Sequence, residues 1–358
     1  MEIDRSELER LVAARGPPGE EYEVASVFET LIEPFVDEIV RDEMGNVVAS
    51  SYGDPDERDV LLAAHTDELA FLVDGITDDG LLSFTMMGGH YRGYQPGQVV
   101  RVGPNRVPGV IGAKPRHFMD EDEKQRLPET FHIDVGATTR AEATALGIEP
   151  GDHATWDREL IELSNDRIAG RALDDRCLLA ALLAVARQND ADRTVHFAAT
   201  VQEEVGLRGA RAVAAELDPD VAVALEIFPT DDYPVDGERS STTELGAGPV
   251  VEIADGTSEY LFGGLLVDRQ TREWLGRSAA IADVELQHDV MIGGTTDSTE
   301  FQRAGGARHA GAIAVPCRYT HSPVETIDWT DLQALGDVLV TALSTGFPDR
   351  TDVRGRSE

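Results

Sequence analysis

The segment TVHFAATVQEEVGLRGA, residues 194–210, determines how the rest of the chain is interpreted. Its first half is a short apolar run rich in residues that favour β-structure, which predicts a buried strand. The run leads to two adjacent carboxylates, Glu203 and Glu204, with glycines and a helix-like apolar stretch after them. In open α/β sheets, ligands bind at the carboxyl ends of strands. Two acids at such an edge can divide the work, one holding a metal ion and the other moving protons. A solvated acidic turn is the competing interpretation.

Length and composition indicate a globular protein of two domains. The chain has 358 residues, of which 41% are hydrophobic, and this is enough for a sizeable core. No run of 18 apolar residues occurs and the first residues are charged, so the sequence predicts neither a transmembrane helix nor a signal peptide. The only cysteines, Cys177 and Cys317, argue against a disulfide framework. We therefore expect a cytoplasmic protein.

Acidic residues dominate the charge of the chain. The formal net charge is -36, and Lys114 and Lys124 are the only lysines among 31 basic residues. Such a surface repels nucleic acids and anionic membranes, so neither is an expected partner. The composition resembles that of proteins from salt-loving (halophilic) organisms, in which hydrated carboxylates maintain solubility in concentrated salt. An acid at any single position is therefore weak evidence of function.

A second buried strand, predicted at Val60–Ala64, ends at a histidine and two acids: His65, Asp67 and Glu68. A single histidine at such a position is more often structural than functional. The His-x-Asp spacing, however, places His65 and Asp67 on the same side of an extended segment. That arrangement suits a metal ligand and a carboxylate that orients it.

Three more candidate ligands occupy comparable positions. Asp174 and its neighbour Asp175 precede an apolar helical run, where capping of the helix is the alternative role. Glu226 follows a third predicted buried strand, and His321 follows a fourth. The strand-end pattern thus recurs along the chain.

Residues 70–166 differ in character from the segments on either side. Short alternating runs there are separated by Gly, Pro and Asp turns, and helical periodicity is scarce. We therefore predict an α/β fold in which a catalytic domain, residues 1–68 plus 166–358, carries an inserted β-barrel-like domain at residues 69–165.

Helical periodicity marks both ends of the chain. Apolar spacing predicts helices at residues 6–15 and 21–40. A last amphipathic helix is expected to begin at a cap formed by Asp328 or Thr330.

The candidate ligands together form a set that two metal ions can use. They are two imidazoles and three carboxylates, which Zn²⁺ and Co²⁺ accept: His65, Asp174, Glu204, Glu226 and His321. If one carboxylate is shared, each ion has three protein ligands and an open position, as in two-metal hydrolytic sites. Glu203 is adjacent to a ligand and is placed to carry a proton from water to a leaving amine.

Four segments resemble the motifs of the M42 metalloaminopeptidases, a family that includes tetrahedral-type and glutamyl aminopeptidases and relatives labelled endoglucanase. The segments are HTDE at 65–68, ALDDR at 172–176, QEEVGLRGA at 202–210 and RYTHSP at 318–323. They occur in the family's order over nearly the whole chain, and the insertion also matches, with DVGA at 134–137 and GIEPGD at 147–152. The four motifs together are specific, whereas HTDE alone is not.

This resemblance implies an α/β/α metallopeptidase domain of the phosphorylase/hydrolase-like type that binds two divalent ions, Zn²⁺ or Co²⁺, per subunit. The implied ligands are His65, Asp174 and Glu226 for one ion and Asp174, Glu204 and His321 for the other. Glu203 is then the general base, and Asp67 orients His65. The family usually has Asp where Glu226 stands, and a longer carboxylate can still bind while shifting that ion.

The resemblance also implies an aminopeptidase that hydrolyses N-terminal residues from peptide substrates. The insertion resembles the family's lid and dimerisation domain, which implies a homo-oligomer, with a dodecamer as one candidate. An M20-type carboxypeptidase or N-acyl amino acid deacylase is the main alternative, but its inserted domain is α+β and lies later in the chain. A glycoside hydrolase needs two carboxylates and no metal-binding histidines. A binding protein without activity is expected to lack the general base, which is present at Glu203.

The composition predicts that folding depends on salt. Because screening relieves repulsion within a chain of net charge -36, the melting temperature should rise steeply with salt concentration. Thermal unfolding followed across a salt series tests this. A melting temperature that stays constant from low to molar salt would show that the acidic composition has another cause.

Overall fold

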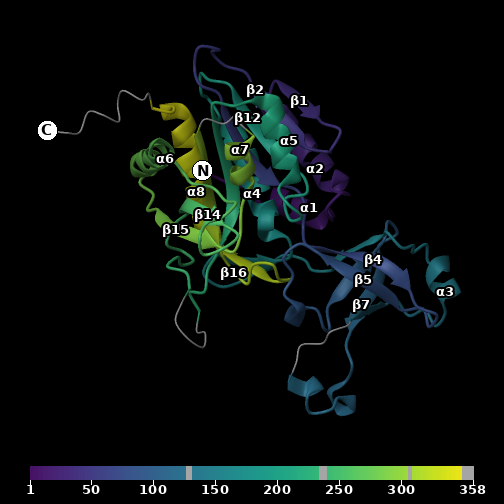
Figure 1. Cartoon of the computed structure of the whole chain (residues 1–358). Coiled ribbons are helices and arrows are strands. Elements are labelled where there is room, and N and C mark those ends of the chain that lie inside the picture. Colours follow the sequence, from purple (N-terminus) through teal and green to yellow (C-terminus); the bar gives the residue numbers. More distant parts are fainter. Residues whose placement is uncertain (126–130, 234–239, 305–308, 349–358) are drawn as a thin grey trace.

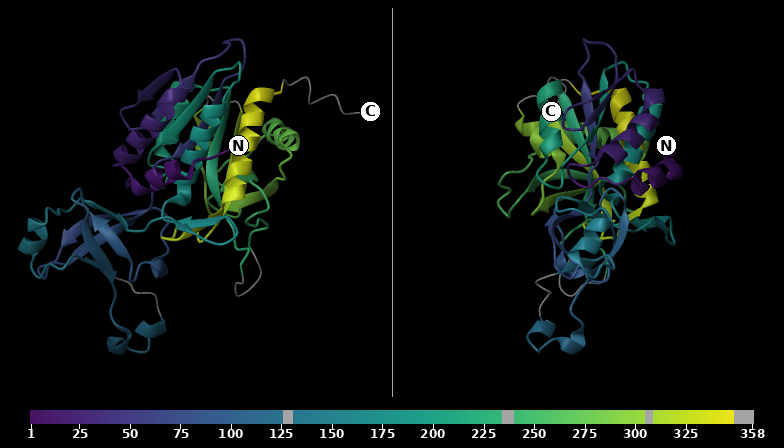
Figure 2. Two further views of the ribbon diagram at one scale, coloured as in Figure 1. Left: turned by 180° about the vertical axis from the view of Figure 1, so that it is seen from behind. Right: turned by 90° about the vertical axis from the view of Figure 1, so that its right-hand side faces the viewer.

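The computed structural model describes residues 1–125, 131–233, 240–304 and 309–348. It has two lobes, a layered α/β/α domain and a smaller β-barrel that projects from one end of it (Figure 1). In two further views the barrel again stays on one side of the layered domain (Figure 2). The predicted α/β fold with an inserted barrel is therefore confirmed.

Within the described residues, a mixed sheet of eleven strands forms the middle layer of the large domain, and most of its strands follow the order β1-β2-β12-β3-β13-β16-β17-β11-β10. Their bounds are β1 (Glu38–Arg41), β2 (Val47–Ser51), β3 (Val60–His65), β10 (Ile161–Glu162), β11 (Arg167–Gly170), β12 (Val195–Thr200), β13 (Val221–Pro229), β16 (His309–Arg318) and β17 (Glu325–Asp328), and the branch strands are β14 (Val250–Gly256) and β15 (Gln287–Ile292). The central strands β12, β3, β13 and β16 run parallel to one another. Their carboxyl ends therefore meet at one edge of the sheet.

Helices cover both faces of this sheet. They are α1 (Arg5–Ala13), α2 (Tyr22–Ile32), α4 (Leu173–Gln188), α6 (Arg269–Ala282) and α8 (Trp329–Thr345), which share one core, and α5 (Arg208–Leu217) and α7 (Asp297–Arg303), which share the other. Strand β3 separates the two cores, because Val60 and Leu62 face the first and Leu61 and Ala63 face the second. Among the helices in the described ranges, none is long and apolar enough to cross a membrane.

The helix predicted at residues 21–40 is shorter than expected. Helix α2 ends at Ile32, and a short 3₁₀ turn containing Pro34 leads into β1. A proline lacks a backbone N–H and clashes with the preceding helical turn, so the helix cannot continue through it. At the other end of the chain, Asp328 Oδ1 accepts a hydrogen bond from Thr330 N at 3.0 Å, which confirms the predicted cap of α8.

The smaller lobe is a closed barrel with the strand order β4-β5-β8-β7-β6-β9. Its elements are β4 (Ala70–Ile76), β5 (Leu82–Met87), β6 (Val99–Val102), β7 (Val107–Gly112), β8 (His132–Asp134), α3 (Arg140–Ala145) and β9 (His153–Trp156). The barrel has its own apolar core, which includes Phe71, Ile133 and Trp156. These barrel strands all lie between residues 69 and 165, and the following strand β10 pairs with β11 of the large sheet.

Two buried arginines of the large domain stabilise the junction between the lobes. Arg15 donates to the carbonyl oxygen of Gly103 at 2.8 Å and to Thr155 Oγ1 at 3.2 Å, both in the barrel. Arg171 pairs with Glu68, which lies two positions before the first barrel strand, β4. Because Glu68 follows the His65 segment directly, this junction lies beside the predicted ligands.

Candidate metal centre

The predicted ligands gather where the central parallel strands end. His65 is the last residue of β3, and Glu203 and Glu204 lie in the turn between β12 and α5. His321 follows β16, and Asp174 lies at the start of α4. Segments that are far apart in the sequence therefore bring their polar side chains to the same edge of the sheet.

Glu226 occupies a different position from the one expected. The sequence predicts a strand that ends just before it, but β13 continues as far as Pro229. Glu226 therefore lies within the strand, where it is aligned with Ala314 of β16. Its backbone is fixed by the sheet rather than by a turn.

Asp174 lies between the two histidines of the cluster, His65 and His321. Its Oδ1 lies 3.0 Å from His65 Nε2, and its Oδ2 lies 3.6 Å from His321 Nε2. His321 Nε2 is also 3.6 Å from Glu204 Oε2. Three sets of residues each place one possible ligand atom per residue within 4.8 Å of the others: His65, Asp174, Asp175 and Glu226; Asp174, Glu204 and His321; and His65, Glu203 and Glu204.

These spacings fit divalent cations. Two ligand atoms bound at about 2.0–2.1 Å to one tetrahedral ion lie about 3.3 Å apart. The distances from Asp174 to the two histidines, 3.0 and 3.6 Å, fall on either side of that value. The donors are imidazole nitrogens and carboxylate oxygens, which Zn²⁺ and Co²⁺ accept. Since acids outnumber histidines in the cluster, bound cations would supply the positive charge that it lacks.

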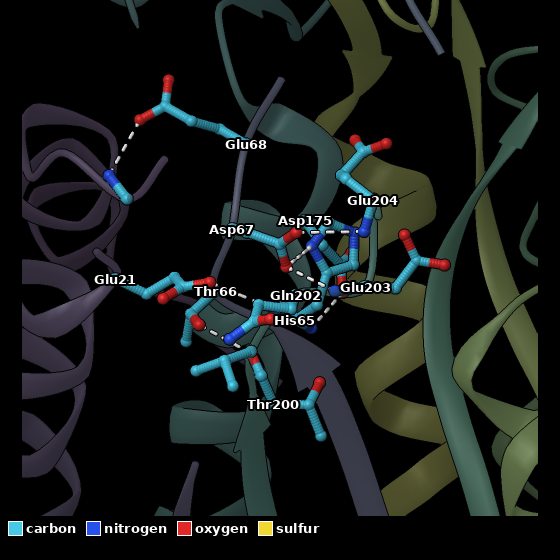
Figure 3. Close-up of polar contacts among 12 residues, drawn as sticks. Glu21, His65, Thr66, Asp67, Glu68, Asp175, Thr200, Gln202, Glu203 and Glu204 are labelled. Carbon is cyan, nitrogen blue, oxygen red and sulfur yellow. Dashed lines mark hydrogen bonds and ion pairs between the residues drawn. The ribbon is translucent and has the colours of Figure 1, made fainter. Parts of the chain in front are cut away.

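Asp67 holds both a predicted ligand and the acidic turn (Figure 3). Its Oδ1 lies 3.4 Å from His65 Nδ1, on the side of the ring that faces away from Asp174. The same carboxylate accepts hydrogen bonds from Glu203 N at 2.9 Å and from Glu204 N at 3.0 Å. It therefore fixes the turn in addition to the predicted role beside His65.

Two further buried carboxylates, which the sequence analysis did not assign, hold the backbone of the ligand segments. Glu325 accepts hydrogen bonds from Asp174 N and His321 N, each at 3.0 Å. Asp175 Oδ2 accepts one from His65 N at 3.0 Å. The side-chain hydrogen bonds that the structure gives Asp174 and Asp175 are with His65, from its ring to Asp174 and from its backbone N–H to Asp175, rather than with the first amides of α4. The only sequence signal for Glu325 was its position four residues after His321.

Glu21 supports the acidic turn from the N-terminal helical region (Figure 3). Its Oε1 accepts hydrogen bonds from Gln202 N at 3.1 Å and from Gly19 N at 2.7 Å. Gln202 has a left-handed φ of 56°, a conformation that a non-glycine residue keeps only when its surroundings hold it. No sequence pattern indicated this contact.

Burial and crowding of acids shift the protonation of the cluster. Burial raises the pKa of Glu203 and that of Glu226 well above their usual range. Burial also raises the pKa of Glu204 to about 7. Burial alone would lower the pKa of His65, but its hydrogen bond to Asp174 contributes to a net rise well above the usual value. Without cations these groups therefore retain protons, which bound metal ions would displace.

A cleft of about 530 Å³ opens onto the cluster. Its walls include Glu203, Glu204, His321 and residues 291–296. An adjoining cavity of about 530 Å³ shares Pro229 and part of the 291–296 segment with it. The cluster is thus accessible from a groove that can accept an extended substrate.

Comparison with known proteins identifies the family. Residues 45–338 match the family model described as M42 glutamyl aminopeptidase. The chain belongs to the M42 peptidase family. A putative aminopeptidase of Acetivibrio thermocellus is 32% identical over 337 residues, which are 94% of this chain and 97% of that protein.

Solved structures of the family resemble the whole chain. An aminopeptidase, APDkam598, from the archaeon Desulfurococcus kamchatkensis matches with a TM-score of 0.90 and 34% identity over 95% of this chain and 94% of that one. The TET1 peptidase of Pyrococcus horikoshii, described as able to assemble into a tetrahedron or a large octahedral shell, matches with a TM-score of 0.82 and 30% identity. That match covers 95% of this chain and 99% of the other.

This M42 peptidase is therefore a hydrolase of a metal-dependent family whose named relatives are aminopeptidases. The predicted resemblance is confirmed, and the M20-type carboxypeptidase or deacylase is not favoured. The buried cluster of acids and histidines provides a place for the metal.

Metal binding by this cluster should release protons and weaken at low pH. Because the pKa of Glu204 is about 7 without an ion, protons compete with the cation below that pH. The affinity of the chelator-treated protein for Zn²⁺ should therefore fall as the pH is lowered from about 8 to about 6. Calorimetry in buffers of different ionisation enthalpy measures both the affinity and the protons released, and an affinity that is constant over this range would contradict the prediction.

Proposed function

We propose that this chain is a dinuclear metal-dependent aminopeptidase that removes N-terminal residues from peptides. The position of Asp174, with one oxygen facing His65 and the other facing His321, carries the proposal. One ion would be held by His65, Asp174 and Glu226, and the other by Asp174, Glu204 and His321. The donor set supports Zn²⁺ or Co²⁺ as the native metal.

Bound ions would polarise the scissile carbonyl and lower the pKa of a water molecule. The chain's own residues perform the proton transfer. Glu203 lines the cleft beside Glu204, and nearby cations favour the ionised form of its carboxylate. Glu203 then accepts the proton from water and passes it to the leaving amine. Asp67 keeps His65 and the Glu203 turn in place during this transfer.

Replacing Glu203 by Gln should separate catalysis from metal binding. General acid–base catalysis is typically worth roughly 10²–10⁴-fold, so kcat should fall by about that factor while KM changes far less. Both ions and the fold should be retained. Metal analysis and peptide hydrolysis measured on the same sample test this.

Glu204→Gln is the matched variant, because the two residues are adjacent and share Asp67 as a partner. It should lose an ion that Glu203→Gln keeps. Because His65, Glu203 and Glu204 also form a compact set, the opposite result is structurally accessible and would reverse the two roles. Full activity in both variants would remove this turn from the catalytic centre.

We further propose that the chain forms a homo-oligomer in the cytoplasm. The assembly described for the Pyrococcus horikoshii peptidase supports an oligomer, as do the exposed aromatic side chains of Tyr260, Phe262 and Phe118. The two free, buried cysteines fit a reducing compartment.

The oligomer should be visible as a particle several times heavier than one chain of 38.8 kDa. Light scattering coupled to size exclusion in high salt measures this mass, and salt is needed there because the acidic surfaces repel one another. A particle with the mass of a single chain would contradict the proposal.

A further inference from the structure

We infer that the inserted barrel orients the proposed metal ligand His321 through the backbone carbonyl of Gly89. This inference rests on the proposed dinuclear site. His321 Nδ1 lies 3.1 Å from Gly89 O, whereas Nε2 faces Asp174 and Glu204 at 3.6 Å each. Because a carbonyl oxygen can only accept a hydrogen bond, Nδ1 donates its proton to Gly89. The lone pair of Nε2 is then directed toward the ion.

The position of Gly89 is set by the core of the barrel. The ring of the next residue, His90, packs against Phe71 and Trp156, with centroid distances of 4.7 and 5.2 Å. His90 Nε2 lies 3.0 Å from the carbonyl oxygen of Ala70 at the start of β4. Burial lowers the pKa of His90 to about 4, so this ring is neutral and Nε2 carries the proton. Gly89 itself is exposed, and it is tied to the packed core of the barrel through the adjacent His90.

The segment that carries Gly89 is fitted closely against two proposed ligands of one ion. A Cβ atom on Gly89 would lie 2.7 Å from His321 Nδ1 and 2.9 Å from its Cε1. A Cβ atom on Gly88 would lie 3.2 Å from Glu204 Oε2 and 2.3 Å from Leu69 Cδ2. A side chain at either glycine would therefore force the neighbouring atoms to move.

The two proposed ions therefore differ in their dependence on the barrel. The ion at Glu204 and His321 has ligands that touch the barrel segment, whereas His65 and Glu226 are supplied by strands of the large sheet. A change in the Gly89 segment should weaken the first ion and spare the second. A displacement of the barrel is thereby linked to the occupancy of one metal position.

Gly89→Ala tests the inference directly. Gly89 does not have a left-handed φ, so alanine is compatible with its backbone, and the added Cβ acts on the His321 ring. Loss of partners that orient metal ligands typically costs 10- to 100-fold in metal affinity. We expect the affinity of one ion to fall by about that factor, while the other ion binds as in the unmodified protein. Calorimetric titration of the chelator-treated protein with Zn²⁺ measures both steps, and kcat should fall with the weaker step.

Gly112→Ala is the matched control. Gly112 lies in the same barrel, has no left-handed φ, and a Cβ there would meet no atom of the described residues within 4 Å. This variant should bind both ions with unchanged affinity. Equal Zn²⁺ titrations for Gly89→Ala and the unmodified protein would overturn the inference, as would equal weakening of both ions.

A measurement on the unmodified protein decides the matter if Gly89→Ala fails to fold. In ¹⁵N-histidine-labelled, Zn²⁺-loaded protein, the long-range proton–nitrogen spectrum shows which ring nitrogen carries the proton, and His321→Gln identifies the His321 signal. We expect the proton on Nδ1 and the metal on Nε2, and the reverse arrangement would overturn the inference. If the protein binds two ions in this way but releases no amino acid from peptides, the proposed function fails while the inference stands.

Discussion

The site depends on hydrogen bonds that buried carboxylates accept from the backbone amides of the ligand segments. Asp67 holds the turn after β12, and Glu325 joins the segment at the start of α4 to the segment after β16. Asp175 and Glu21 hold two further amides in the same way. Burial raises the pKa of Glu325 and of Asp175 well above their usual range, and the amide hydrogen bonds offset only part of that rise. These outer acids fix the backbone of the ligand segments through their hydrogen bonds, and the inner layer, which consists of the proposed ligands, remains available for cations.

Burial separates these acids from the many others in the chain. With a net charge of -36, the sequence gives little reason to single out any one carboxylate. In the structure, Asp67 and Asp175 are 0% exposed and Glu325 is 3% exposed. Burying a charge is costly unless it is paired or hydrogen-bonded, while an acid on the surface needs no partner. The buried acids at the ligand segments have such partners in the backbone amides. Adaptation of the surface to salt does not explain these hydrogen bonds, whereas a functional cluster requires them.

Apolar runs and their polar ends were sufficient to predict the central strands, the inserted barrel and the residues that the structure brings together. The helix predicted at residues 21–40 was wrong in its length, because the prediction gave more weight to the apolar periodicity than to Pro34, after which the helix does not continue. The outer carboxylates were missed for another reason. Asp175 binds an amide 110 residues away, and Glu21 binds one 181 residues away. Such pairs depend on which strands become neighbours, and no local pattern encodes that.

Glu226 shows how the two layers work together at one position. The family resemblance implies a shorter aspartate there, and β13 lies between β3 and β16, so the backbone of Glu226 cannot withdraw to accommodate the longer side chain. The additional methylene must be absorbed by the side-chain torsions and by the position of the ion. Asp175 belongs to the same compact set, and its Oδ1 has no hydrogen-bond partner among the residues that the structure describes. Asp175 thus offers a further carboxylate oxygen beside Glu226, the ligand position at which this chain departs from the family pattern.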